Sequence, residues 1–137
     1  MIGWLYRAAD LLRRRTLAED HGRLGEDLAY RYLRGRGCTV VARNYAARSG
    51  AGEIDLVAWE HGVLVFVEVK TRSSGDFGAP DAAVDGEKRR RIAIAAREYG
   101  YRAQVEAAKT RFDIVSVMLG SPPRVEWRRD AFRVRDI

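Results

Sequence analysis

The chain has 137 residues, of which 47% are hydrophobic and 32% are charged, so it is long and apolar enough for one globular domain and too apolar for general disorder. Its 25 Lys and Arg residues against 19 Asp and Glu give a net charge of +6, which favours an anionic partner, nucleic acid before an acidic membrane surface. The single cysteine, Cys38, excludes a disulfide framework or a cysteine-rich zinc site and fits a reducing, cytoplasmic setting.

The first 15 residues are expected to form a helical extension in front of a single domain that covers residues 16–137. Their basic cluster follows the apolar residues and no small-residue cleavage site comes after it, which is not the pattern of a secretory signal. An amphipathic helix that binds a membrane or a partner is the alternative interpretation of this segment. Because no apolar run approaches the roughly 18–20 residues of a membrane span, we expect no membrane partner.

Hydrophobic periodicity and turn residues predict the remaining elements in chain order. Thr16 and Glu19 form a capping-box pattern that predicts the start of a helix, and Gly35 and Gly37 predict its end. Strands are then expected at residues 38–45, 53–59, 63–71 and 111–119, with a helix at 81–99 and a short fifth strand near 125–128. This α-β-β-β-α-β order predicts an α/β fold in which helices flank a mixed sheet.

The charge is distributed unevenly along the chain. Residues 1–49 carry 10 basic and 5 acidic residues, residues 50–86 carry 2 and 7, and residues 87–137 carry 13 and 7. The net charges are therefore +5, −5 and +6, an acidic middle between two basic flanks. A protein that only coats phosphates has no obvious need of an acidic middle, whereas a metal site that acts on phosphates does.

The predicted third strand changes character toward its end. One of its faces carries valines at positions 63, 65, 67 and 69, while the other begins with Leu64 and Phe66. That second face then continues with Glu68 and Lys70. An acid and a lysine at the end of a buried strand are unfavourable unless they are paired or functional.

The predicted second strand supplies a complementary carboxylate. A hairpin across residues 60–62 would bring Asp55 close to Glu68, and two converging carboxylates repel each other unless a divalent cation neutralises them. We therefore expect Asp55 and Glu68 to bind Mg²⁺, with Mn²⁺ as the alternative ion. Lys70 would orient a metal-bound water or stabilise the transition state at a phosphate. The alternative is a structural Glu68–Lys70 pair at the sheet edge, with Asp55 in a turn.

At this point the sequence resembles a known family. Residues 52–56 (GEIDL) and 65–72 (VFVEVKTR) resemble the D…E-x-K core of the PD-(D/E)xK nuclease superfamily, and about residues 20–120 are most similar to the YraN-like family of bacterial proteins. Further matches lie at residues 25–26 (GE), 43–45 (RNY), 77–78 (FG) and 111–113 (RFD). One departure is Ile54, where the superfamily pattern has proline before the aspartate.

The resemblance implies a restriction-endonuclease-like core, similar to that of archaeal Holliday-junction resolvases. Asp55 would take the role of the metal-bridging aspartate, Glu68 that of the second metal ligand and Lys70 that of the catalytic lysine. Glu26 would match the acidic residue that some junction resolvases place on the first helix, the alternative being an exposed helix acid. No clear Gln-x-x-x-Tyr motif follows the lysine, which disfavours a processive exonuclease.

Basic residues around this centre are expected to contact phosphates. The set is Arg43, Arg72, Lys88, Arg89 and Arg91. For the residues on the second predicted helix, a solvated helix face is the alternative.

The sequence therefore predicts a Mg²⁺-dependent endonuclease that acts on DNA, and fold analogy suggests a branched or structured substrate. A non-catalytic nucleic-acid-binding protein with the same fold and a basic module that docks an acidic partner are the two alternatives. Because so small a chain can contact only a short stretch of nucleic acid, a homodimer or a protein partner is a further expectation.

Overall fold

The computed structural model describes residues 2–73 and 86–134, with side chains described from residue 17 onward. The elements in chain order are α1 (Ile2–Gly35), β1 (Thr39–Ala46), β2 (Glu53–Glu60), β3 (Val63–Arg72), α2 (Gly86–Ala103), the short 3₁₀ helix η1 (Ala107–Lys109), β4 (Thr110–Met118) and β5 (Arg124–Phe132). None of the helices in these two ranges combines the length and apolarity that crossing a bilayer requires.

The strands form one five-stranded sheet in the order β1-β2-β3-β4-β5. Only β3 and β4 pair in parallel, and the other three pairings are antiparallel. The parallel pair is possible because α2 lies between the two strands in the chain and returns it to the same end of the sheet. This mixed sheet flanked by helices confirms the predicted α/β class and is consistent with a restriction-endonuclease-like core.

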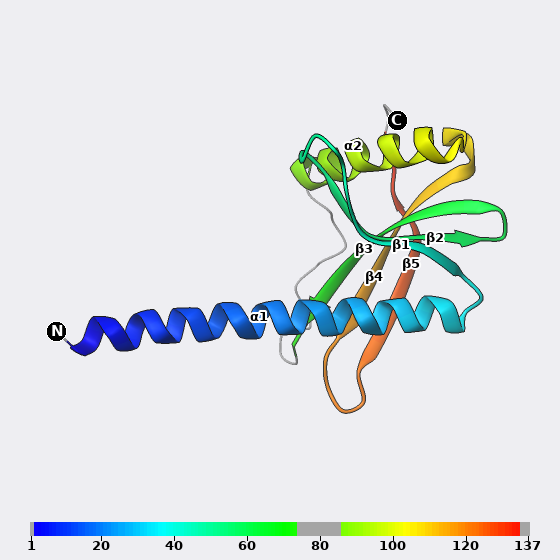
Figure 1. Ribbon diagram of the computed structural model, residues 1–137. Helices are drawn as coiled ribbons and strands as arrows, with labels where there is room; N and C mark the ends of the chain where they lie inside the picture. The colour runs from blue at the N-terminus through cyan, green and yellow to red at the C-terminus, as the bar shows by residue number, and fades with distance from the viewer. Residues whose placement is uncertain (1, 74–85, 135–137) are drawn as a thin grey trace.

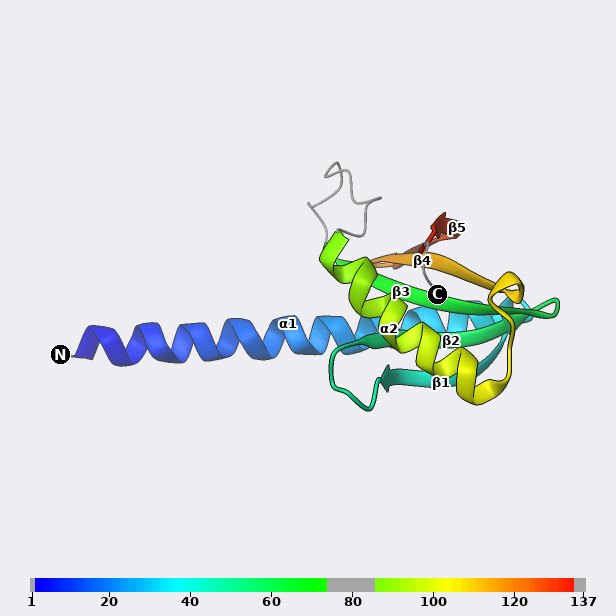
Figure 2. The same ribbon diagram turned by 90° about the horizontal axis from the view of Figure 1, so that it is seen from above.

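The two helices cover opposite faces of the sheet (Figures 1 and 2). On one face, Ala29 and Leu33 of α1 pack against Val65 and Val67 of β3. On the other face, Ile92 and its neighbours in α2 pack against a second apolar cluster, which contains Val57, Leu64, Phe66, Phe112 and Ile114. The alternation predicted for the third strand is therefore confirmed, since its valines face α1 and its larger apolar side chains face α2.

The helix α1 begins earlier than the sequence indicated. It is continuous from Ile2 to Gly35, so the start predicted at Thr16 is wrong and residues 2–15 are the first turns of the same helix. These residues contain Ala, Leu and Arg with no proline, so nothing interrupts the helix before the capping-box pattern. The N-terminal part of α1 extends well beyond the sheet (Figures 1 and 2).

The predicted end of the first helix and the predicted hairpin are both confirmed. Gly37 has φ of +93°, and the N–H of Cys38 donates to the carbonyl of Leu33 at 3.0 Å, which is a glycine-capped helix end. His61 and Gly62 have φ of +49° and +80°, as in the two-residue turns that match strand twist, and they join β2 to β3.

The later elements differ from the prediction in length. Strand β5 covers Arg124–Phe132, more than twice the length expected, because its residues pair with β4 from Met118 back to Phe112. Helix α2 begins at Gly86 and continues to Ala103, and the predicted helical residues 81–85 lie outside the described residues. The loop matches at residues 77–78 also lie outside them.

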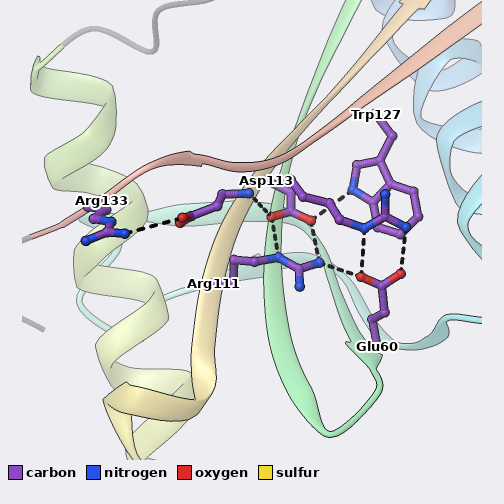
Figure 3. A network of polar contacts seen from close by, with 7 residues as sticks. Glu60, Arg111, Asp113, Trp127 and Arg133 are labelled. Atoms are coloured by element: carbon purple, nitrogen blue, oxygen red, sulfur yellow. Dashed lines mark hydrogen bonds and ion pairs between the residues drawn. The ribbon is translucent and has the colours of Figure 1, made fainter.

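A buried polar network ties β2, β4 and β5 together near the hairpin end of the sheet (Figure 3). Asp113 is fully buried, and its carboxylate accepts hydrogen bonds from Arg111 at 2.8 and 2.9 Å and from the indole N–H of Trp127 at 2.9 Å. Glu60 accepts from Arg111 at 2.7 Å and from Arg129 at 2.9 and 3.0 Å. The hydrogen bonds from Arg129 are the main reason that the pKa of Glu60 falls to about 2. Asp113 therefore has a structural role: it lies beside Val67, one position from Glu68 in the register of β3 and β4, but on the face of the sheet that α1 covers.

Candidate active site

The site begins where β2 and β3 separate. The last paired residues of this ladder are Leu56 and Val67, one position before Asp55 and Glu68. Beyond that point a side chain takes the place of a backbone carbonyl as the acceptor, since Oδ2 of Asp55 accepts a hydrogen bond from the N–H of Val69 at 2.8 Å. Glu68 lies beside it with only 5% of its surface exposed, and both line one cleft. The predicted convergence of these two carboxylates is thus confirmed.

The negative charge of Glu68 affects the ionisation of Asp55. Burial, followed by the negative charge of Glu68, raises the pKa of Asp55 to about 7, and the hydrogen bond from Val69 offsets only part of this shift. The local environment therefore disfavours two negative charges in the absence of a cation. A divalent ion would remove that penalty, because it compensates both carboxylates at once.

Glu26 approaches the pair from α1, on the other side of the sheet. Burial is the main cause that raises its pKa, while the side chain of Asn44 and the charge of Arg43 lower it. Its charge also contributes to the raised pKa of Asp55, so the two groups are near neighbours. Among the described residues, however, no three acidic, histidine or cysteine side chains are grouped closely enough to hold a metal ion. Glu26 therefore lies next to the Asp55–Glu68 pair without completing a three-ligand cluster.

A glycine on α1 makes the approach of Glu26 possible. A Cβ added at Gly25 would lie 1.8 Å from Oγ1 and 2.8 Å from Cβ of Thr71 on β3, so only glycine fits there. At Gly22, three residues earlier on the same helix, a Cβ would meet no atom within 4 Å.

Replacing Gly25 by alanine should therefore lower the free energy of unfolding by about 1–3 kcal/mol, because the helix must move away from β3. Gly22→Ala is the matched control and should raise it by about 0.5–1 kcal/mol through helix propensity alone. Urea denaturation of the two variants measures both effects. Equal stabilisation by both substitutions would show that α1 does not pack on β3 as closely as described.

Helix α2 covers the other side of the site. A Cβ added at Gly52, directly before β2, would lie 2.1 Å from the backbone oxygen of Arg91, so the helix is in close contact with the chain at the entry to this strand. Between them is a cleft of about 330 Å³, lined by Glu53, Asp55, Glu68, Glu87, Lys88, Arg91 and Ile92. The cleft therefore combines the candidate metal ligands with two of the basic residues predicted to contact phosphates.

The basic residues of α2 do not share one exposed face. The Nζ of Lys88 forms an ion pair with Oε1 of Glu68, inside the cleft. Arg91 lies 3.9 Å from Glu53 at the cleft rim, and both side chains are exposed. The guanidinium of Arg89 lies 5.5 Å from the centre of the Phe132 ring and is partly buried. The helix thus directs two of these three side chains to the cleft and packs the third against β5.

The other predicted residues lie around the end of β3 and on β1. Lys70 follows Glu68 on the same face of β3 and is half-buried, with Ser116 of β4 as its backbone partner. Arg72 is half-buried at the end of this strand. Arg43 lies on the α1 side, where it pairs with Asp27 and stacks 4.6 Å from the centre of the Tyr30 ring.

One contact near the site was not predicted. Glu98 of α2 accepts a hydrogen bond from the hydroxyl of Tyr45 at 2.6 Å and another from the backbone N–H of Arg48 at 3.1 Å. These hydrogen bonds hold α2 against β1 and the β1–β2 turn, and so fix the helix that forms one wall of the cleft. The sequence carried no signal for them, because the partners are about fifty residues apart in the chain.

The donor set fits a hard divalent cation. Mg²⁺ is usually held by one or two carboxylates, and it keeps several waters and takes substrate phosphate oxygens for its other positions. Asp55 and Glu68 supply such a pair at the wall of an open cleft, and basic side chains lie around it. Cys38 and the two histidines do not line the cleft, so it lacks the thiolate and imidazole ligands that softer metal ions prefer.

Comparison with known proteins gives a consistent result. The model of a family described as "Uncharacterised protein family UPF0102" matches residues 25–117. The UPF0102 protein of Solibacter usitatus is 65% identical over 96% of this chain and 100% of its own length. The UPF0102 proteins of Koribacter versatilis and Rhodococcus opacus are each 45% identical over 81% of this chain, and the matches cover 78% and 94% of their lengths. The matched range contains Glu26, Asp55, Glu68, Lys70 and Lys88.

Proposed function

The chain belongs to the UPF0102 family, the YraN-like members of the PD-(D/E)xK superfamily, and on this premise we propose that it is a Mg²⁺-dependent endonuclease that cleaves DNA. One observation carries the proposal. At the fork between β2 and β3, the half-buried Asp55 converges with the buried Glu68, and the pKa of Asp55 is raised. Both carboxylates lie at the wall of a cleft with basic side chains. Perturbed acids in a cleft are typical of catalytic sites.

In this proposal Asp55 and Glu68 hold the cation. When bound, Mg²⁺ would lower the pKa of a coordinated water and offset negative charge on the scissile phosphate. The hydrogen bond from the Val69 N–H orients Asp55, while burial between β3 and α2 restricts Glu68. Both ligands are therefore held in place before the cation arrives.

Lys70 acts on the reacting groups in this proposal. It follows Glu68 by two residues on the same face of β3, so its position is fixed by the strand. A positive charge there would hold the attacking water or stabilise the transition state. Arg91 at the cleft rim and Arg72 at the strand end contact the DNA backbone on either side. Glu26 adds negative charge next to the ligands and would interact with the cation through water.

A second function is favoured by a specific contact. Because Lys88 already pairs with Glu68, one of the two carboxylates is compensated without any metal ion. In a protein that has this fold and binds nucleic acid without cleaving it, such an ion pair would stabilise the buried carboxylate in place of a metal ion. Under that alternative the cleft would bind phosphates through Arg91, the arginine of its lining.

The decisive assay incubates the protein with single-stranded, duplex, flap and four-way-junction DNA, with Mg²⁺ or Mn²⁺ and with EDTA. We expect metal-dependent cleavage by the parent, and a rate about 10²–10³-fold lower for Lys70→Met with DNA binding retained. Lys109→Met, at an exposed lysine of η1, is the matched control and should cleave like the parent.

The same assay separates the two functions. Equal DNA binding by all three proteins with no cleavage of any substrate would favour the non-catalytic alternative. The absence of salt-dependent DNA binding would contradict both.

A further inference from the structure

Lys88 provides the cationic group that faces Glu68 in the structure. Glu68 is 5% exposed, whereas the Lys88 side chain is 50% exposed. Its Nζ pairs with Oε1 of Glu68, at the wall of the cleft that Asp55 also lines. The ammonium thus reaches a buried carboxylate from the solvent side, through the mouth of the cleft.

The Lys88–Glu68 ion pair compensates only part of the charge that the two carboxylates can carry. Asp55 and Glu68 can carry two negative charges, and this pair compensates one of them. A divalent cation bound to the carboxylate oxygen that contacts the ammonium would lie within a few ångströms of it, and the two positive charges would repel each other. Binding of a divalent cation through that oxygen therefore requires Lys88 to leave it.

We propose that Lys88 is a positioning residue, an inference that rests on the proposed function. Its ammonium contacts the carboxylate oxygen of Glu68 that would bind the metal ion, and it is displaced from that oxygen when a divalent cation binds. In the absence of metal it keeps Glu68 compensated and in place. Once displaced, its ammonium stays in the cleft next to Arg91, where a substrate phosphate would meet it. Lys88 thereby couples metal binding to phosphate binding.

The fold permits this exchange without movement of α2. The helix is held by the close contact at Gly52 and by the hydrogen bonds of Glu98, both away from the Lys88 side chain. A lysine has a flexible four-carbon stem, so its ammonium can move by several ångströms while its backbone stays fixed. Half of the Lys88 side chain is exposed, so its ammonium can move toward the solvent.

The test measures Mn²⁺ binding to the full chain in the absence of DNA, by isothermal titration calorimetry and by electron paramagnetic resonance of free Mn²⁺. Lys88→Gln removes the competing charge and should tighten Mn²⁺ binding about tenfold, equivalent to about 1.4 kcal/mol. Arg90→Gln is the control, since it removes one charge from an exposed position of the same helix and should change the affinity less than about twofold. Lys88→Arg keeps the charge and should bind Mn²⁺ like the parent.

The outcomes separate this proposal from the proposed function. Parent binding that Asp55→Asn abolishes but Lys88→Gln leaves unchanged or weakens would overturn the role of Lys88 and leave the metal site standing. Equal tightening by Lys88→Gln and Arg90→Gln would also overturn it, because the effect would then come from net charge. No Mn²⁺ binding by any folded variant, with folding checked by thermal melting, would remove the metal site together with the role of Lys88.

Discussion

Asp55→Asn is expected to stabilise the protein at pH 8 while it abolishes metal-dependent cleavage. The folded state raises the pKa of Asp55 from 3.8 to about 7, so the folded protein holds this proton more tightly than the unfolded chain does. Asp55 therefore lowers the free energy of unfolding. This loss is absent below pH 3.8, grows as the pH rises and is complete above about pH 7. Asparagine removes the charge and can still accept the hydrogen bond from Val69.

Urea denaturation at pH 8 and pH 4 measures this effect. We expect Asp55→Asn to raise the free energy of unfolding at pH 8 by on the order of 2 kcal/mol and to change it little at pH 4. Asp27→Asn, at an exposed carboxylate on α1 that pairs with Arg43, should change stability by less than about 1 kcal/mol at either pH. If Asp55→Asn instead lowers stability at pH 8, then Asp55 has the structural role considered as the alternative.

Asp113→Ala is expected to cause the largest loss of stability in the molecule. Its buried carboxylate accepts hydrogen bonds from Arg111, from the indole of Trp127 and from the backbone N–H of Asp130 (Figure 3). Removal of the acceptor leaves a guanidinium, an indole N–H and a backbone N–H without this partner in the sheet interior. Breaking such a buried ion pair costs about 3–5 kcal/mol.

A surface ion pair in the same region gives the control. Arg133 lies 3.6 Å from Asp130, with 86% of the arginine side chain exposed, so Arg133→Ala should cost less than about 1 kcal/mol. Chemical denaturation of both variants compares the two positions directly. A cost below about 1 kcal/mol for Asp113→Ala would mean that Asp113 is free for another role, such as support of the site.

The pair of site carboxylates could be predicted because strand geometry is local. A two-residue period placed Glu68 on the face of Phe66, and a short turn at His61 and Gly62 left one antiparallel register that brings Asp55 next to it. The register and the change from apolar to charged residues were both visible in the sequence. The fold class followed from the same alternation.

The rest of the site depends on how the helices dock, which the sequence does not encode locally. Lys88 and Arg89 are neighbours in one basic run, yet one pairs with Glu68 and the other lies over Phe132. Their directions follow from the rotation of α2, which is set by the close contact at Gly52. In the same way, the need for glycine at position 25 could not be predicted without knowing that Thr71 lies against it. Contacts between distant segments decide these positions.

The most direct test of a metal centre at the fork is a crystal structure of the full chain grown with Mn²⁺, with anomalous diffraction recorded. We predict one anomalous peak coordinated by oxygens of both Asp55 and Glu68, with the Lys88 ammonium displaced from Glu68. A map with no peak between these carboxylates at saturating Mn²⁺, and with the Lys88–Glu68 pair intact, would contradict it.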